Sequence, residues 1–105
     1  MSLRIYDFEI ETLKMLSPVM REIGRVDPDL ARQMRRAAAS IVLNTAEGEG
    51  FGDGNRRLRF RSALGSTKET RACLEVAAAL DYAPIDEVLV DRLDRIAATL
   101  FRLAR

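Results

Sequence analysis

Hydrophobic residues recur at intervals of three and four along almost the whole chain, and this helical period most constrains the fold. Strand signals are nearly absent, because no stretch alternates apolar and polar residues over a useful length. The pattern predicts an all-α protein, with helices over about residues 3–24, 28–48, 55–80 and 85–104. The short connections favour antiparallel neighbours, so we expect residues 1–105 to form one domain, an up-down-up-down four-helix bundle.

Local signals mark the helix ends. Gly24 is predicted to end the first helix, and Pro18 is predicted to kink it near Leu16. Asp27 is a good N-cap for the second helix, with Pro28 as the first helical residue. The fourth helix carries the cleanest apolar stripe, which predicts one seam against a partner: Ile85, Leu89, Leu93, Ile96, Leu100 and Leu103.

The second and third helices are apolar on more than one side. The third helix has two apolar sectors, of which one comprises Phe60, Ala63, Leu64, Leu74 and Ala78, and the other Leu58, Cys73, Val76, Ala77 and Leu80. Packing into a bundle buries one apolar stripe of a helix. A helix that is apolar on two sides must therefore bury a second surface as well. A subunit interface is one explanation, and a compact monomer that buries its central helices widely is the other.

Four glycines alternate with other residues at Gly48, Gly50, Gly52 and Gly54. Their spacing does not match a dinucleotide-binding loop, no P-loop lysine is present, and a helix rather than a strand precedes them. The run is therefore interpreted as a helix end and a connector, with Gly48 or Gly50 as the left-handed cap.

Composition excludes several classes of function. The chain has no histidine, which removes Ser-His and Cys-His catalysis and the Glu-x-x-His pairs of ferritin-like metal sites. Cys73 is the only cysteine, and no apolar run reaches membrane-spanning length. We expect a cytoplasmic, non-enzymatic protein with no membrane partner, no metal and no cofactor.

Polar residues interrupt the second helix. Buried polar groups must be paired, so we expect an inter-helix hydrogen-bond network in which Arg57 or Arg61 is the partner of Glu47. The members of this network are Arg36, Ser40, Asn44 and Glu47.

Basic residues cluster although the net charge is only +1. Four arginines in six residues at a helix start are electrostatically adverse, because the helix N-terminus is itself positive. Their counter-charge is either the carboxylates of the preceding loop or a phosphate backbone. The candidate nucleic-acid residues are Arg35, Arg56, Arg57, Arg59, Arg61 and Lys68.

The stretch "QMRRAAASIVLNTAEGEG", followed by arginines and "FRSALGSTKET", resembles the bacterial four helix bundle protein family, first found in intervening sequences of 23S rRNA genes. The resemblance covers the central third to half of the chain. The family is also similar to the accessory variability protein of diversity-generating retroelements, a basic bundle that binds nucleic acid and a reverse transcriptase. The resemblance implies a cytosolic, ring-like homopentamer without enzymatic activity. The retroelement proteins are strongly basic, so nucleic-acid binding by this chain would depend on its local patch.

Three hypotheses follow from these observations. The first is a homopentameric bundle that binds RNA or DNA through the arginine patch. The second is a protein-protein adaptor or scaffold without nucleic-acid affinity, in which the arginines are consumed in ion pairs within and between subunits. The third, an enzyme, has no residue pattern to support it.

Overall fold

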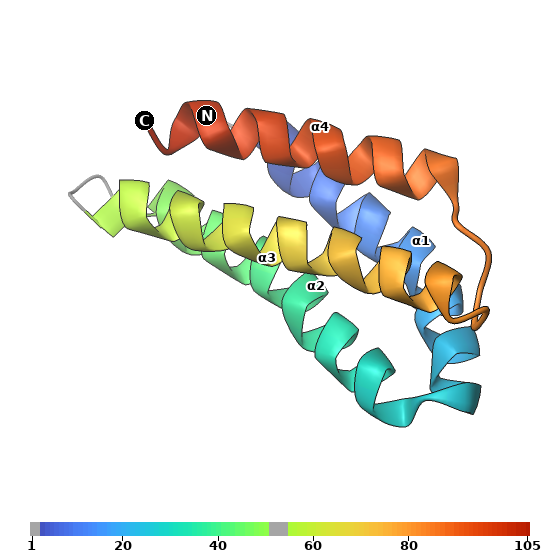
Figure 1. Cartoon of the computed structure of the whole chain (residues 1–105). Helices are drawn as coiled ribbons and strands as arrows, with labels where there is room; N and C mark the ends of the chain where they lie inside the picture. The colour runs from blue at the N-terminus through green and yellow to red at the C-terminus, as the bar shows by residue number, and fades with distance from the viewer. Residues whose placement is uncertain (1–2, 51–54) are drawn as a thin grey trace.

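Four α-helices make up the protein, and the computed structural model describes residues 3–50 and 55–105 (Figure 1). The helices are α1 (Leu3–Val26), α2 (Pro28–Gly50), α3 (Asn55–Ala79) and α4 (Glu87–Leu103). No β-strand occurs among the described residues, so the all-α prediction is confirmed. Each helix begins and ends within two residues of its predicted position.

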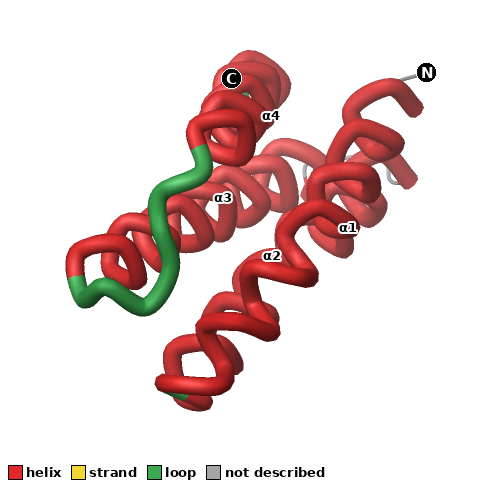
Figure 2. Tube along the Cα trace, turned by 90° about the vertical axis from the view of Figure 1, so that its right-hand side faces the viewer, coloured by secondary structure: helices red, strands yellow, loops and turns green. Residues whose placement is uncertain are grey.

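Side-chain contacts show that α2 and α3 run in opposite directions. Ser66 of α3 donates to Ser40 of α2 at 2.9 Å, and Arg59 pairs with Glu47 at 3.0 Å, so α2 and α3 are antiparallel. The α1–α2 and α3–α4 turns lie at one end of the molecule, and the end of α2 and the start of α3 lie at the other (Figure 1). In Figure 2 the connection from α3 to α4 is an extended loop, whereas α1 passes almost directly into α2.

Aspartate caps set the starts of α2 and α4. The Asp27 carboxylate accepts a hydrogen bond from the Leu30 amide at 3.0 Å, which confirms the predicted N-cap. Asp86 accepts from two amides of the first turn of α4, so this helix begins at Glu87. Ile85 therefore lies before the helix and is 39% exposed, and its predicted place in the α4 seam is wrong.

Gly24 does not end α1, which contains Pro18 and continues to Val26. Gly24 lies where α1 meets α2, because a Cβ at this position would be 3.4 Å from the Cβ of Ala31. The prediction that Gly24 stops the helix is therefore wrong, and its small size serves packing. Pro18 is exposed, so water can satisfy the carbonyl that loses its intrahelical donor.

Gly48 is a packing residue rather than a helix cap. Helix α2 runs through Gly48 to Gly50, and no described glycine has a positive φ, so the predicted left-handed cap is wrong at both positions. A Cβ on Gly48 would be 2.8 Å from Cε1 of Phe60, a ring with no solvent exposure. Only glycine lets α3 place this ring against α2. Gly52 and Gly54 lie outside the described residues.

The core follows the α4 stripe and one side of α3. Cys73 is 3% exposed, as predicted, and Ala77 is also buried. The second α3 sector is therefore divided, because its remaining members are exposed: Leu58, Val76 and Leu80. The α4 residues that fill the seam are Leu89, Leu93, Ile96 and Leu100.

Glu9 of α1 is the buried ionisable residue that the sequence interpretation missed. It is 2% exposed, and its Oε2 accepts a hydrogen bond from Thr45 of α2 at 2.8 Å, whereas Oε1 has no partner. Burial raises the pKa of Glu9 to about 8; the Thr45 bond lowers the pKa and the nearby Glu49 charge raises it. The side chain is therefore mostly protonated at neutral pH.

Replacing Gly48 by alanine should destabilise the fold by about 1–3 kcal/mol, because the new methyl group overlaps the immobile Phe60 ring. This cost exceeds the gain in helix propensity, which is at most about 1 kcal/mol. Gly50→Ala, on the same helix, is the matched control. No atom lies within 4 Å of its added Cβ, so it should stabilise the protein by at most about 1 kcal/mol. Urea unfolding measures both changes, and an equal gain for the two variants would contradict the packing role.

Stability should fall as pH rises from about 5 to 8, because folded Glu9 holds its proton up to a pKa of about 8 while the unfolded residue loses it near 4.5. The slope contributed by Glu9 is at most about 1.4 kcal/mol per pH unit. Glu9→Gln should remove that contribution while its amide oxygen still accepts from Thr45. Glu22→Gln, on an exposed side chain of the same helix, should keep the wild-type slope. Identical slopes for all three proteins in urea titrations at several pH values would refute the buried-acid account.

Candidate functional site

The start of α3 is strongly basic. Between Asn55 and Lys68 the chain has five basic residues and no acidic one, and Arg56, Arg57, Arg59 and Arg61 are all exposed. Two of them have contacts within the chain. Arg59 pairs with Glu47 at 3.0 Å, and the guanidinium of Arg56 lies over the Phe60 ring, 5.1 Å from its centroid. The predicted partners of Glu47, Arg57 or Arg61, are wrong, because each lies two residues from Arg59 along α3.

The other three cations of this candidate cluster have no partner in the described part of the chain, whereas Arg71, further along α3, pairs with Glu75 and Asp94. Arg57, Arg61 and Lys68 are exposed, and none forms a hydrogen bond or ion pair there. Their spacings of four and seven residues place them along one side of α3. Like charges at these spacings repel each other, so the side is poised for an external anion.

Arg35 does not belong to this cluster. It lies on α2, twelve residues before Glu47, which corresponds to about 18 Å along the helix axis. Four of the six predicted residues therefore lie together at the start of α3, Lys68 follows seven residues after Arg61 on the same helix, and Arg35 is separated from the four arginines. Arg35 instead lines a cavity near the α1–α2 turn.

The predicted polar network exists in part. The Asn44 amide donates to the Ser40 hydroxyl at 2.9 Å, and Ser66 links that hydroxyl to α3 at 2.9 Å. Glu47 joins through Arg59 rather than through the serines. Arg36 is exposed and has no polar partner among the described residues, so its predicted membership is wrong. The network fixes the register of α2 against α3.

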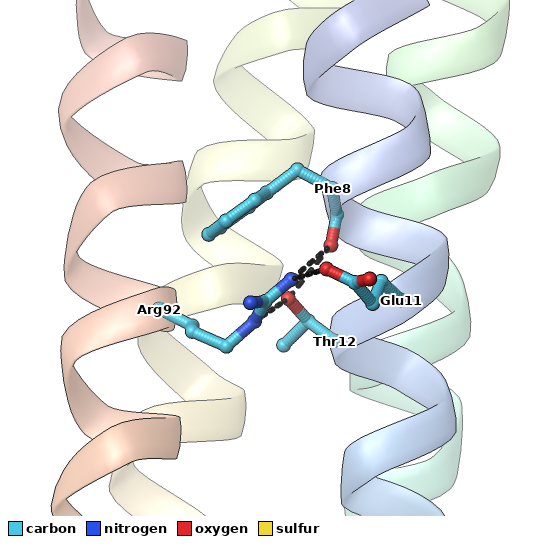
Figure 3. A network of polar contacts seen from close by, with 4 residues as sticks. All are labelled: Phe8, Glu11, Thr12 and Arg92. Carbon is cyan, nitrogen blue, oxygen red and sulfur yellow. Dashed lines mark hydrogen bonds and ion pairs between the residues drawn. The ribbon is translucent and has the colours of Figure 1, made fainter.

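Arg92 of α4 forms a second polar cluster, which the sequence interpretation missed (Figure 3). Its Nε donates to the Thr12 hydroxyl at 2.8 Å, and Nη2 donates to the Phe8 carbonyl at 3.2 Å and to Glu11 at 2.7 Å. The guanidinium also stacks on the Phe8 ring at 3.8 Å. The side chain is only 14% exposed, so this residue fastens α4 to α1 rather than binding a ligand.

Other classes of site have little support in the described residues. No group of three or more His, Cys, Asp or Glu side chains in residues 3–50 and 55–105 could hold a metal ion. No described helix is both long and apolar enough to cross a membrane.

Comparison with known proteins identifies the family. The family model for the 23S rRNA-intervening sequence protein matches residues 6–102. No curated protein matches. A crystal structure of a protein of unknown function from the S23 ribosomal protein family, from Bacteroides thetaiotaomicron, has a similar fold, with a TM-score of 0.86. It is 18% identical in sequence, and the alignment covers 96% of this chain and 98% of the other. Because the family model spans nearly the whole sequence, the chain belongs to the 23S rRNA-intervening sequence protein family.

Proposed function

We propose that this protein is a cytosolic, non-enzymatic homo-oligomer that binds nucleic acid along the basic side of α3. Each subunit is an up-down-up-down bundle, and five subunits form a ring. The observation that carries the proposal is a set of exposed cations that have no partner among the described residues, on a helix segment free of acidic residues: Arg57, Arg61 and Lys68.

Electrostatics supports an anionic partner. The positive end of the α3 dipole adds to the repulsion among the arginines, and Glu47 neutralises only Arg59. Such an arrangement costs stability unless an anion lies nearby. A phosphate backbone supplies closely spaced negative charges, and its binding releases counterions.

The exposed apolar residues support assembly. Leu58 and Val76 are 55% and 43% exposed, and eighteen residues, or five full turns, separate them, so they face the same side of α3. Between them, at the spacings of a coiled-coil seam, lie three small residues and one charged residue: Ser62, Gly65, Glu69 and Ala72. These small residues would let a helix of a second copy approach closely. Assembly along this seam would bring the basic sides of neighbouring subunits together.

The alternative function is a protein-protein adaptor. It predicts that the arginines form ion pairs within and between subunits, and within the described part of the single chain only Arg59 of the six candidate cations does so. The exposed Leu43 and Leu80 would suit a protein partner equally well. The unpaired cations therefore favour nucleic acid over the adaptor.

A binding titration tests the nucleic-acid proposal. Arg56→Gln with Arg57→Gln should weaken binding to a labelled RNA hairpin and a DNA duplex by about tenfold or more at low salt. The slope of log K against log salt should become shallower by about 1.8 if each side chain contacts one phosphate.

The matched control is Lys14→Gln with Arg95→Gln, which removes the same charge from exposed positions on α1 and α4. The control should bind within about threefold of wild type, whereas equal losses in both variants would show that only net charge matters. Absence of wild-type binding to either nucleic acid at low salt would contradict the proposal.

A further inference from the structure

A second basic cluster lies at the α1–α2 turn, at the opposite end of the molecule from the start of α3 (Figure 1). Here a cavity of about 420 Å³ opens between the two helices. Its lining contains four arginines and no acidic residue: Arg21, Gly24, Arg25, Pro28, Arg32 and Arg35. We propose that this cavity, which we name the corner site, binds a phosphate group.

The internal partners of these arginines leave most of their charge available. Arg25 and Arg35 have no hydrogen bond or ion pair in the described part of the chain, and Arg21 donates only to the neutral Ser17 hydroxyl, at 2.9 Å. Arg32 pairs with Asp29 at 2.6 Å, but the two side chains are 61% and 90% exposed. So exposed an ion pair contributes little to stability, and another anion can replace Asp29 as the partner of Arg32.

The nearby acidic residues do not fill the cavity. The Asp27 carboxylate caps α2 by accepting from the Leu30 amide at 3.0 Å. Glu22 is exposed on α1 and does not line the cavity. The negative end of α1 and the positive end of α2 meet at this turn, so their dipoles largely offset each other. The field in the cavity is therefore set by the guanidinium groups.

Gly24 gives the corner site its floor. A Cβ on Gly24 would be 3.8 Å from Nη2 of Arg35, so the guanidinium of Arg35 extends from α2 to the surface of α1. Arg21 and Arg25 flank this glycine on α1, and the cavity thus has guanidinium groups on both helices. Planar guanidinium forks match the oxygens of a phosphate in paired hydrogen bonds, which a lysine ammonium cannot reproduce. This geometry favours phosphate over a smaller or monovalent anion.

The phosphate could belong to a free nucleotide or to a nucleic-acid backbone, and two probes distinguish these sources. The Gly24 amide resonance reports on the corner site during titration with ATP and, separately, with a 20-nucleotide RNA. We expect ATP to shift this resonance. Arg25→Gln with Arg35→Gln should weaken ATP binding by about tenfold, and Arg25→Lys with Arg35→Lys should weaken it by a smaller factor.

The variant Lys14→Gln with Arg95→Gln, at exposed positions on α1 and α4 outside both basic clusters, serves as the charge-matched control and should bind ATP within about twofold of wild type. If Arg25→Gln with Arg35→Gln weakens RNA binding, the ligand of the corner site includes a backbone phosphate. If that variant weakens ATP binding and leaves RNA binding unchanged, the ligand is a free phosphate compound. The corner site does not depend on the α3 proposal, because ATP binding lost in the corner variant supports it even if RNA binds nowhere.

If neither ATP nor RNA shifts the Gly24 amide resonance, the corner site is overturned. The corner site would also be overturned if Arg25→Gln with Arg35→Gln bound both ATP and RNA within twofold of wild type. If Arg56→Gln with Arg57→Gln then lost RNA binding, only the α3 proposal would be supported. Thermal unfolding checks that each variant is folded. The lysine variant retains the charge and provides an independent test if the glutamine variant is unstable.

Discussion

Close contact between α2 and α3 is the constraint on which the rest of the structure depends. Gly48 leaves room for the Phe60 ring, and the Ser40 and Ser66 hydroxyl groups meet at 2.9 Å. Small residues at these positions let the two helix backbones approach, and the buried ring fixes their register. Because Phe60 lies among the arginines of α3, the packing that buries the ring also determines where Arg57 and Arg61 project.

This contact also explains why one surface of the helix pair is left uncovered. Helices α2 and α3 use one side against each other and another against α1 and α4, so Leu43 and Leu58 remain 63% and 55% exposed. Arg92 fastens the far pair of helices, α1 and α4, by three hydrogen bonds and a stacking contact. The subunit is thus internally complete, and its remaining apolar surface is available for another chain.

The sequence predicted the helices well because hydrophobic periodicity and aspartate caps are local signals, as at Asp27. It did not predict the role of Gly48, because a glycine that ends a helix and one that admits a neighbouring ring look alike in sequence. The partner of Glu47 was missed because Arg57 and Arg61 each lie two residues, or about 200° around the helix, from Arg59, and only the packing of α2 on α3 selects Arg59. Glu9 could have been found, since it falls on the stripe of Ile5, Thr12 and Leu16 at spacings of four and three.

Molar mass in solution tests most directly the claim that the outer face of α2 and α3 is covered by further copies of the chain. Sedimentation equilibrium should give wild type five times 11.8 kDa, or about 59 kDa. Leu43→Glu should shift the mass toward that of the single chain, because it places a charge in the apolar face. Val88→Glu, at a similarly exposed position on α4, should leave the assembly intact. A wild-type protein that sediments as a single 11.8 kDa chain at micromolar concentration would contradict the account.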